Sequence, residues 1–179
     1  MNQPAPVVLG TPPGGRRDPL ADLDAHASTP DGRVGVRIRG RSSLTVTLAP
    51  GYYDQVTETE LSRQLTQLAR LAFVQRTRAY YELRSRAFGR TVTRESSSYG
   101  ARDLSFTAGR ASIVASGSSP DGRIRVTAAG MESWTVDLEP GTLAAYDEAG
   151  FCAAVAAAGH DLIEDQFRQI RRLKDEIYG

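Results

Sequence analysis

The stretch Pro30-Asp31-Gly32-Arg33 reappears 90 positions later as Pro120-Asp121-Gly122-Arg123, and the residues that follow the two stretches agree as well. From Pro30 to Gly51, 12 of 22 positions are identical to their counterparts, where ordinary residue frequencies would give roughly one or two. The alignment runs without a gap from 28–89 onto 118–179. An internal repeat fixes the architecture before any local pattern does. The chain is therefore predicted to contain two copies of one unit.

Each copy has the pattern of a three-stranded β-meander. Pro-Asp-Gly is a turn, because Pro presets φ and Gly accepts a positive φ. After it, Val34, Val36 and Ile38 alternate with arginine and glycine, which is the period of a half-buried strand. A third strand is predicted at 43–49 and 133–139, and each ends at a Pro-Gly pair. The first strand of each copy is predicted near 23–27 and 111–116.

A long helix is predicted to close each copy. Thr57 and Glu60 have the spacing of a capping box, and Asp147 is a candidate N-cap in the second copy. Apolar residues then recur at helical spacing. Each helix is predicted to run for close to 30 residues, about 45 Å. Since a three-stranded sheet cannot cover that length, the far halves are expected to project or to pack on each other.

The predicted organisation has four parts. Residues 1–20 form a Pro- and Gly-rich leader that is disordered or loosely ordered. The first repeat spans 21–89, a linker spans 90–110 with an extra short strand at Leu104–Thr107, and the second repeat spans 111–179. A unit of about 60–70 residues is marginal alone, so the two copies are expected to share a core. The fold class is α+β.

Charge is distributed unevenly. The whole chain carries a net charge of +1, and 21 of its 22 basic residues are arginine, which is typical of a GC-rich genome. Residues 27–110 hold 14 arginines against 7 acidic residues, whereas 111–179 hold 6 basic residues against 11 acidic ones. The first copy is basic and the second acidic. This difference predicts either attraction between the copies or a one-sided basic surface.

The residues of common catalytic and metal sites are scarce. Cys152 is the single cysteine, so neither an intrachain disulfide nor a multi-cysteine metal site is possible. His26 and His160 lack neighbours at ligand spacing. We expect no enzyme activity, no metal and no cofactor. The sequence also lacks a run of about 18 apolar residues and does not begin like a signal peptide, so no membrane association is expected and a cytoplasmic location is the default.

Arginine supplies the candidate site. The residues predicted to contact DNA are Arg33, Arg37, Arg39 and Arg41 on one face of the first sheet, with Arg123 and Arg125 from the second copy. Such a row is either a solvated sheet face or a surface that follows phosphates. A second candidate is the first helix, with Arg63, Arg70, Arg76, Arg78, Arg84 and Arg86. Its aromatics Phe73, Tyr80, Tyr81 and Phe88 are interpreted first as packing between helices.

These motifs resemble a known family. A meander of the form Asp-Gly-Arg-Val-x-Val-x-x-x-Gly, a strand ending Val-x-Leu-x-Pro-Gly, and a long amphipathic helix are similar to the YbaB/EbfC family. The resemblance implies a nucleoid-associated fold whose subunits pair through their sheets while their helices project like tweezers. Single-copy members carry a helix before the first strand, which neither copy here shows convincingly. Because the family works as a homodimer and this chain holds two copies, the resemblance implies a pseudo-dimer.

Two functions follow as expectations. The first is a non-enzymatic, nucleoid-associated protein that binds double-stranded DNA with low sequence specificity. The alternative is a protein-binding scaffold or chaperone-like accessory, since a weaker resemblance links the chain to YbaB-like accessory proteins of type VII secretion. In either case the expected assembly is a monomeric pseudo-dimer or a higher homo-oligomer.

Overall fold

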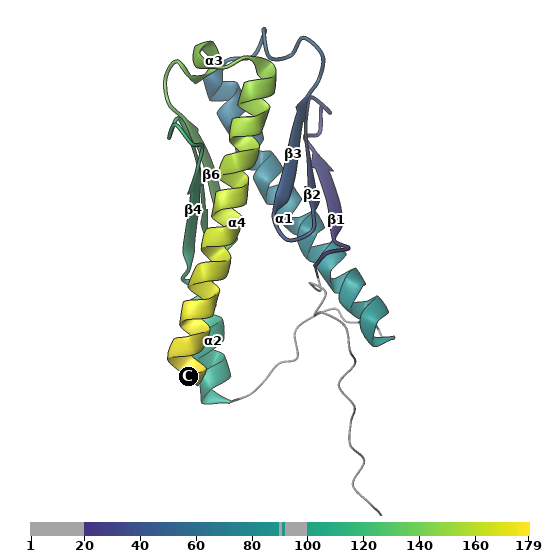
Figure 1. The fold of residues 1–179 in the computed structure, drawn as a ribbon, viewed down its shortest axis with the longest axis vertical. Coiled ribbons are helices and arrows are strands. Elements are labelled where there is room, and N and C mark those ends of the chain that lie inside the picture. Colours follow the sequence, from purple (N-terminus) through teal and green to yellow (C-terminus); the bar gives the residue numbers. More distant parts are fainter. Residues whose placement is uncertain (1–19, 90, 92–99) are drawn as a thin grey trace, which may run out of the picture.

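The computed structural model describes residues 20–89, 91 and 100–179, apart from the side chain of Phe88. In this part of the chain the protein is α+β, with two three-stranded antiparallel sheets and four helices (Figure 1). The predicted leader, except for Leu20, and most of 90–99 lie outside the described residues. The predicted α+β class is confirmed.

The elements follow one another in two similar series. The first is β1 (Asp24–Ser28), β2 (Val34–Arg39), β3 (Ser43–Leu48) and α1 (Glu58–Phe88). The second is α2 (Ala101–Ala111), β4 (Val114–Ser118), β5 (Ile124–Ala129), β6 (Ser133–Leu138), α3 (Thr142–Ala145) and α4 (Glu148–Tyr178). The middle strand of each sheet is β2 or β5. Every strand and long helix of the second series begins and ends 90 positions after its counterpart.

The two long helices begin at the caps that the sequence predicts. The Thr57 hydroxyl accepts a hydrogen bond from the Glu60 amide at 3.3 Å, and the Asp147 carboxylate accepts one from the Gly150 amide at 2.7 Å. Each bond satisfies one of the free amides of a helical first turn. Both helices are 31 residues long, so the predicted length is also confirmed.

One core serves both halves. Helix α1 contacts β1 and β2 of its own sheet and β6 of the other, while α4 contacts β4, β5 and β3. Buried residues of both halves join in a single cluster. The rings of Phe73 and Trp134 pack with centroids 5.7 Å apart, and those of Tyr53 and Phe151 at 5.5 Å. Each half therefore supplies part of the other's core, and the far halves of the helices diverge (Figure 1).

The prediction of a strand at Leu104–Thr107 is wrong. These residues belong to α2, a helix that precedes β4 and contacts the end of α4. Phe106 packs on Tyr178 with centroids 5.9 Å apart, and Gly109 lies against Leu173. The alternation of Leu104 and Phe106 resembles a strand locally, but contact with α4 selects the helix. The second half thus has the helix before its first strand that the sequence did not show.

Side chains of the long helices bind two sheet edges. The Val136 amide of β6 donates to the Thr66 hydroxyl of α1 at 2.9 Å, and the Ser62 hydroxyl donates to the Val136 carbonyl. At β4, the amides of Ser116 and Ser118 donate to Asp165 and Asp161 of α4 at 3.0 and 3.2 Å. These bonds occupy backbone groups that an edge strand leaves unpaired.

Candidate nucleic-acid interface

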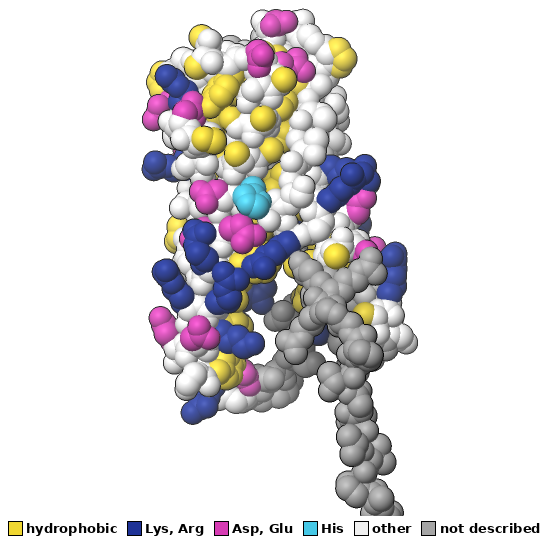
Figure 2. All heavy atoms as spheres, in the orientation of Figure 1, with side chains coloured by type: hydrophobic (Ala, Val, Ile, Leu, Met, Phe, Trp, Pro, Cys, Tyr) yellow, Lys and Arg dark blue, Asp and Glu magenta, His cyan; other side chains and the backbone are white. Residues whose placement is uncertain are grey.

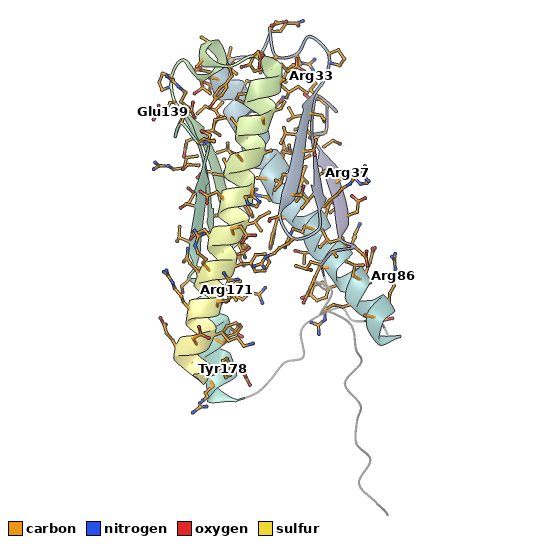
Figure 3. All side chains as sticks on the ribbon, viewed as in Figure 1. Arg33, Arg37, Arg86, Glu139, Arg171 and Tyr178 are labelled. Atoms are coloured by element: carbon orange, nitrogen blue, oxygen red, sulfur yellow. The ribbon has the colours of Figure 1, made fainter. Side chains whose placement is uncertain are left out.

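The outer face of the first sheet carries three of the predicted arginines, two of them paired. Arg37 donates to Asp24 through both its Nε and Nη2 atoms, and this hydrogen bond lowers the pKa of the Asp24 carboxyl below its ordinary value. Arg33 lies 3.7 Å from Asp31 and over the ring of Tyr52. Arg39 is exposed without a carboxylate in ion-pair distance among the described residues. Figure 3 shows Arg33 and Arg37 on the side of the molecule where the first sheet lies.

The second sheet holds its arginines on another side of the molecule. Arg125 is exposed and faces Asp137 across the strand pair, and Arg123 is half-buried with its Nε 3.5 Å from Asp121. Because both sheets turn their buried faces toward the shared core, their outer faces point away from each other (Figure 1). The predicted arginines therefore do not form one continuous surface.

Arg41 does not share the face of Arg37 and Arg39. It follows Gly40, whose φ of +58° turns the chain after β2, so the strand alternation no longer applies. Its guanidinium lies over the ring of Phe167 at 4.3 Å, and its Nε is 3.5 Å from Glu164 of α4. The placement of Arg41 on the sheet surface is corrected: it sits between the two halves.

The far part of α1 carries a higher density of positive charge than either sheet. We call residues 70–88 the α1 arm; it holds five arginines against a single acid, Glu82. Arg70, Arg78 and Arg86 are exposed, and no described carboxylate lies within ion-pair distance of them. Figure 3 shows Arg86 near the end of the arm. These side chains are available to an anionic partner.

The corresponding part of α4 differs in charge. Residues 160–178, the α4 arm, hold four basic residues against five acidic ones. Figure 2 shows Lys and Arg side chains interspersed with Asp and Glu on the face that α4 presents. Arg168 donates to Asp165 at 3.0 Å, so the carboxylate offsets the charge of this arginine. The two arms are alike in backbone and unlike in charge.

The described residues hold few groups suited to catalysis. They contain no group of three or more metal-ligating side chains. Burial raises the pKa of the Cys152 thiol, which disfavours the nucleophilic thiolate. His160 Nδ1 lies 3.0 Å from the Ser42 carbonyl, and His26 is exposed on β1. Among the described helices, none is long and apolar enough to cross a membrane.

No family model, curated protein or solved structure matches the chain.

Two acids on α4 have a role that the sequence pattern does not indicate. The carboxylates of Asp161 and Asp165 accept the edge amides of β4. Their i, i+4 spacing places both on one helix face, and Gly117 on β4 lets that face approach. No pattern in the sequence predicts which strand a helix will lie beside. The role of these two carboxylates therefore becomes apparent only in the structure.

Proposed function

We propose that the protein binds double-stranded DNA without enzymatic activity and with low sequence specificity, and that the α1 arm is the main contact surface. The observation that carries this proposal is the set of exposed arginines on that arm, Arg70, Arg78 and Arg86, which have no ion-pair partner among the described residues. Guanidinium groups bind phosphate oxygens through paired donors. A helix surface that offers only such contacts positions a duplex without reading its bases.

The resemblance to the YbaB/EbfC family supports the same proposal. In that view the chain is a pseudo-dimer in which duplication allowed the two arms to diverge in charge, and the cell's nucleoid is its place of action. The basic α1 arm binds DNA, and the nearly neutral α4 arm contributes little. Arg39 on the first sheet adds a lesser contact, because Arg33 and Arg37 beside it are already paired with carboxylates.

The test is a mobility-shift titration of duplex DNA across a series of salt concentrations with three matched double variants. Arg70→Gln/Arg78→Gln removes charge from the α1 arm, Arg37→Gln/Arg39→Gln from the sheet, and Arg171→Gln/Arg172→Gln from the α4 arm. We expect the first to weaken binding by at least about tenfold and to reduce the slope of log K against log salt by about two. The third should have little effect.

Two results would contradict the proposal in different ways. If micromolar protein gives no shift even at low salt, the protein does not bind duplex DNA. If the sheet variant loses binding and the arm variant keeps it, DNA binding stands and the α1 arm is the wrong surface.

A second function is favoured by one further observation. Val74 is 53% exposed and lies between Arg70 and Arg78 on one helix face. An apolar side chain flanked by cations suits an acidic protein partner. This agrees with the alternative function, a protein-binding scaffold or accessory, including one that serves type VII secretion. Affinity purification of the protein from the native cell after nuclease treatment distinguishes the two functions. Recovery of one stoichiometric protein partner, and its loss with Val74→Asp, would favour the scaffold.

A further inference from the structure

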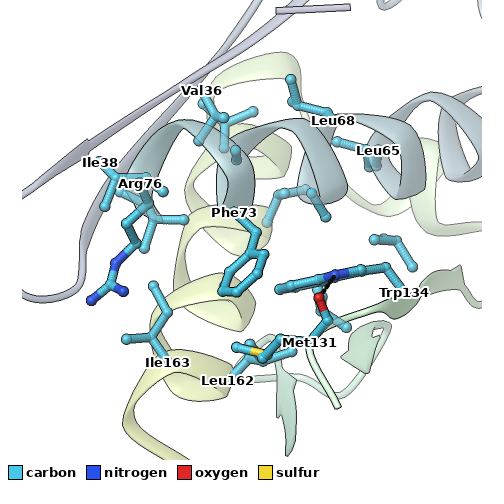
Figure 4. A pocket seen from close by; sticks show the side chains of 18 of the residues that line it. Val36, Ile38, Leu65, Leu68, Phe73, Arg76, Met131, Trp134, Leu162 and Ile163 are labelled. Carbon is cyan, nitrogen blue, oxygen red and sulfur yellow. Dashed lines mark hydrogen bonds between the residues drawn. The ribbon is translucent and has the colours of Figure 1, made fainter. Parts of the chain in front are cut away.

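A cavity lies where both sheets and both long helices meet (Figure 4). Its walls are almost entirely apolar and come from both halves, including Val36, Leu65, Phe73, Val126, Trp134 and Leu162. Among the described side chains that line it, only Arg76 and Gln166 carry a charge or an amide. The indole N–H of Trp134 already donates to the Met131 carbonyl at 3.1 Å. The cavity is therefore an apolar space with one cationic residue at its edge.

The size of the cavity limits what it can hold. The cavity volume is about 80 Å³, and one water-sized group needs roughly 10–15 Å³. The space thus fits about five to eight groups the size of a water molecule or a methylene. Water gains little there because the walls offer few polar partners. An aliphatic chain of that length suits the space better.

Arg76 forms the cationic edge of the cavity, and Arg41, also of the first half, contacts Arg76 from outside the lining. Figure 4 shows Arg76 at one end of the cavity, beside Ile38 and Ile163. Arg76 donates from Nη2 to the Arg41 carbonyl at 3.0 Å, and both guanidinium groups lie over the Phe167 ring. Burial, with Arg41 as a second cause, lowers the pKa of Arg76 below its ordinary value.

This pair of cations is not fully compensated. The Nε atoms of Arg41 and Arg76 are buried, and neither has a hydrogen-bond partner among the described residues. Of the carboxylates described, only Glu164 comes within ion-pair distance of the pair. Its Oε1 atom is 3.5 Å from that same Arg41 Nε and also accepts the Ser42 hydroxyl, so Arg76 Nε is the buried donor without a described anion nearby. Buried donors without acceptors are costly. An anion next to Arg76 would relieve that cost.

We propose that this cavity binds a small amphipathic monocarboxylate, with an aliphatic chain of about five to eight carbon atoms in the apolar space and the carboxylate on Arg76. A carboxylate matches the paired donors of a guanidinium. An alcohol of the same chain length fills the space but brings no charge. An ammonium head adds a third cation beside Arg41 and Arg76. This proposal does not depend on DNA binding.

The experiment uses the full chain and its single tryptophan, Trp134, which lines the cavity. Octanoate, 1-octanol and octylammonium are titrated at neutral pH while the Trp134 emission is recorded. We expect a saturable change with octanoate at an affinity at least tenfold higher than that of octanol, and no saturable change with octylammonium. Equal affinity for octanoate and octanol, or no saturable change with octanoate, would overturn the proposal.

Variants then test the charged end. Arg76→Gln should reduce the octanoate affinity to that of octanol, whereas Arg78→Gln, an exposed arginine two residues further along α1, should leave it unchanged. Unchanged octanoate binding by Arg76→Gln would overturn the role of Arg76. If Arg76→Gln does not fold, nuclear Overhauser contacts in the unmodified protein decide: octanoate methylenes should contact the Trp134 indole protons, and their absence under saturation would place the chain elsewhere.

Discussion

At the scale of single residues, a hydroxyl and a carboxylate hold the turn that precedes each middle strand. The Ser119 hydroxyl donates to Asp121 at 2.7 Å, and the same carboxylate accepts the Arg123 amide at 3.2 Å. In the first half, Thr29 and Asp31 make the same pair. The Pro-Asp-Gly motif therefore acts through its Asp as well as through Pro and Gly. These bonds stabilise the ionised carboxylate.

Replacement of Ser119 by Ala is expected to raise the pKa of Asp121. That pKa lies at about 2, with the Ser119 hydrogen bond as its first cause and Tyr146 as its second. Because the folded value is below the ordinary 3.8, the ionised carboxylate stabilises the fold above pH 4, and this contribution is lost as the pH falls toward 2. NMR titration of the Asp121 carboxyl carbon measures the shift. Ser116→Ala, on exposed β4, is the control; an unchanged midpoint in Ser119→Ala would contradict the assignment.

Gly117 is required by close packing rather than by a turn. A Cβ at this position would lie 2.1 Å from the Ala158 carbonyl oxygen and 2.2 Å from the Leu162 amide nitrogen. Since both atoms belong to the backbone of α4, neither can move away cheaply. Gly117→Ala is expected to lower the free energy of unfolding by at least about 2 kcal/mol, as measured by urea denaturation.

The same substitution at Gly109 is a matched control. Its Cβ would approach only the tip of the Leu173 side chain, at 2.7 Å, and Ala favours a helix interior over Gly by about 0.5–1 kcal/mol. Gly109→Ala should therefore change stability by less than about 1 kcal/mol. Equal losses at the two positions would show that the contact between β4 and α4 is not as tight as described.

At the scale of elements, the long helices protect sheet edges with polar side chains. Thr66 of α1 accepts the Val136 amide of β6, which belongs to the other half. The aligned position on α4 is Ala156, which has no hydroxyl to offer β3. The two halves therefore share a backbone plan and differ in how helices bind the strands beside them.

Thr66→Val is expected to destabilise the protein by about 1–2 kcal/mol, because it keeps the shape of the side chain and removes the acceptor of a partly buried amide. Thr66→Ser retains the hydroxyl and should recover most of that loss. Thermal unfolding gives the stability, and native-state hydrogen exchange should show the Val136 amide exchanging faster in Thr66→Val alone. Equal exchange in both variants would mean that the hydroxyl does not protect this edge.

At the scale of the whole molecule, the two halves depend on each other. The buried cluster joins residues of both sheets and both long helices, and a unit of this size has little core of its own. A fragment of residues 100–179 would expose Trp134, whose ring packs on Phe73.

Residues 100–179 expressed alone are expected to lack a cooperative thermal transition, and addition of residues 20–89 should restore one. Calorimetry and Trp134 fluorescence measure both states. A fragment that unfolds cooperatively as a monomer, confirmed by sedimentation, would show that the second half holds a complete core.

The strands, the long helices and their caps are predictable from local chemistry: the alternation from Val34 to Ile38, the turn at Pro120-Asp121-Gly122, and the capping side chains of Thr57 and Asp147. Other features depend on contacts between distant parts of the chain. Arg41 turns inward, Leu104–Thr107 is helical, Asp161 and Asp165 bind β4, and the arginines of the two sheets face apart. Each of these outcomes depends on which element lies beside another, and that depends on packing between residues far apart in the chain.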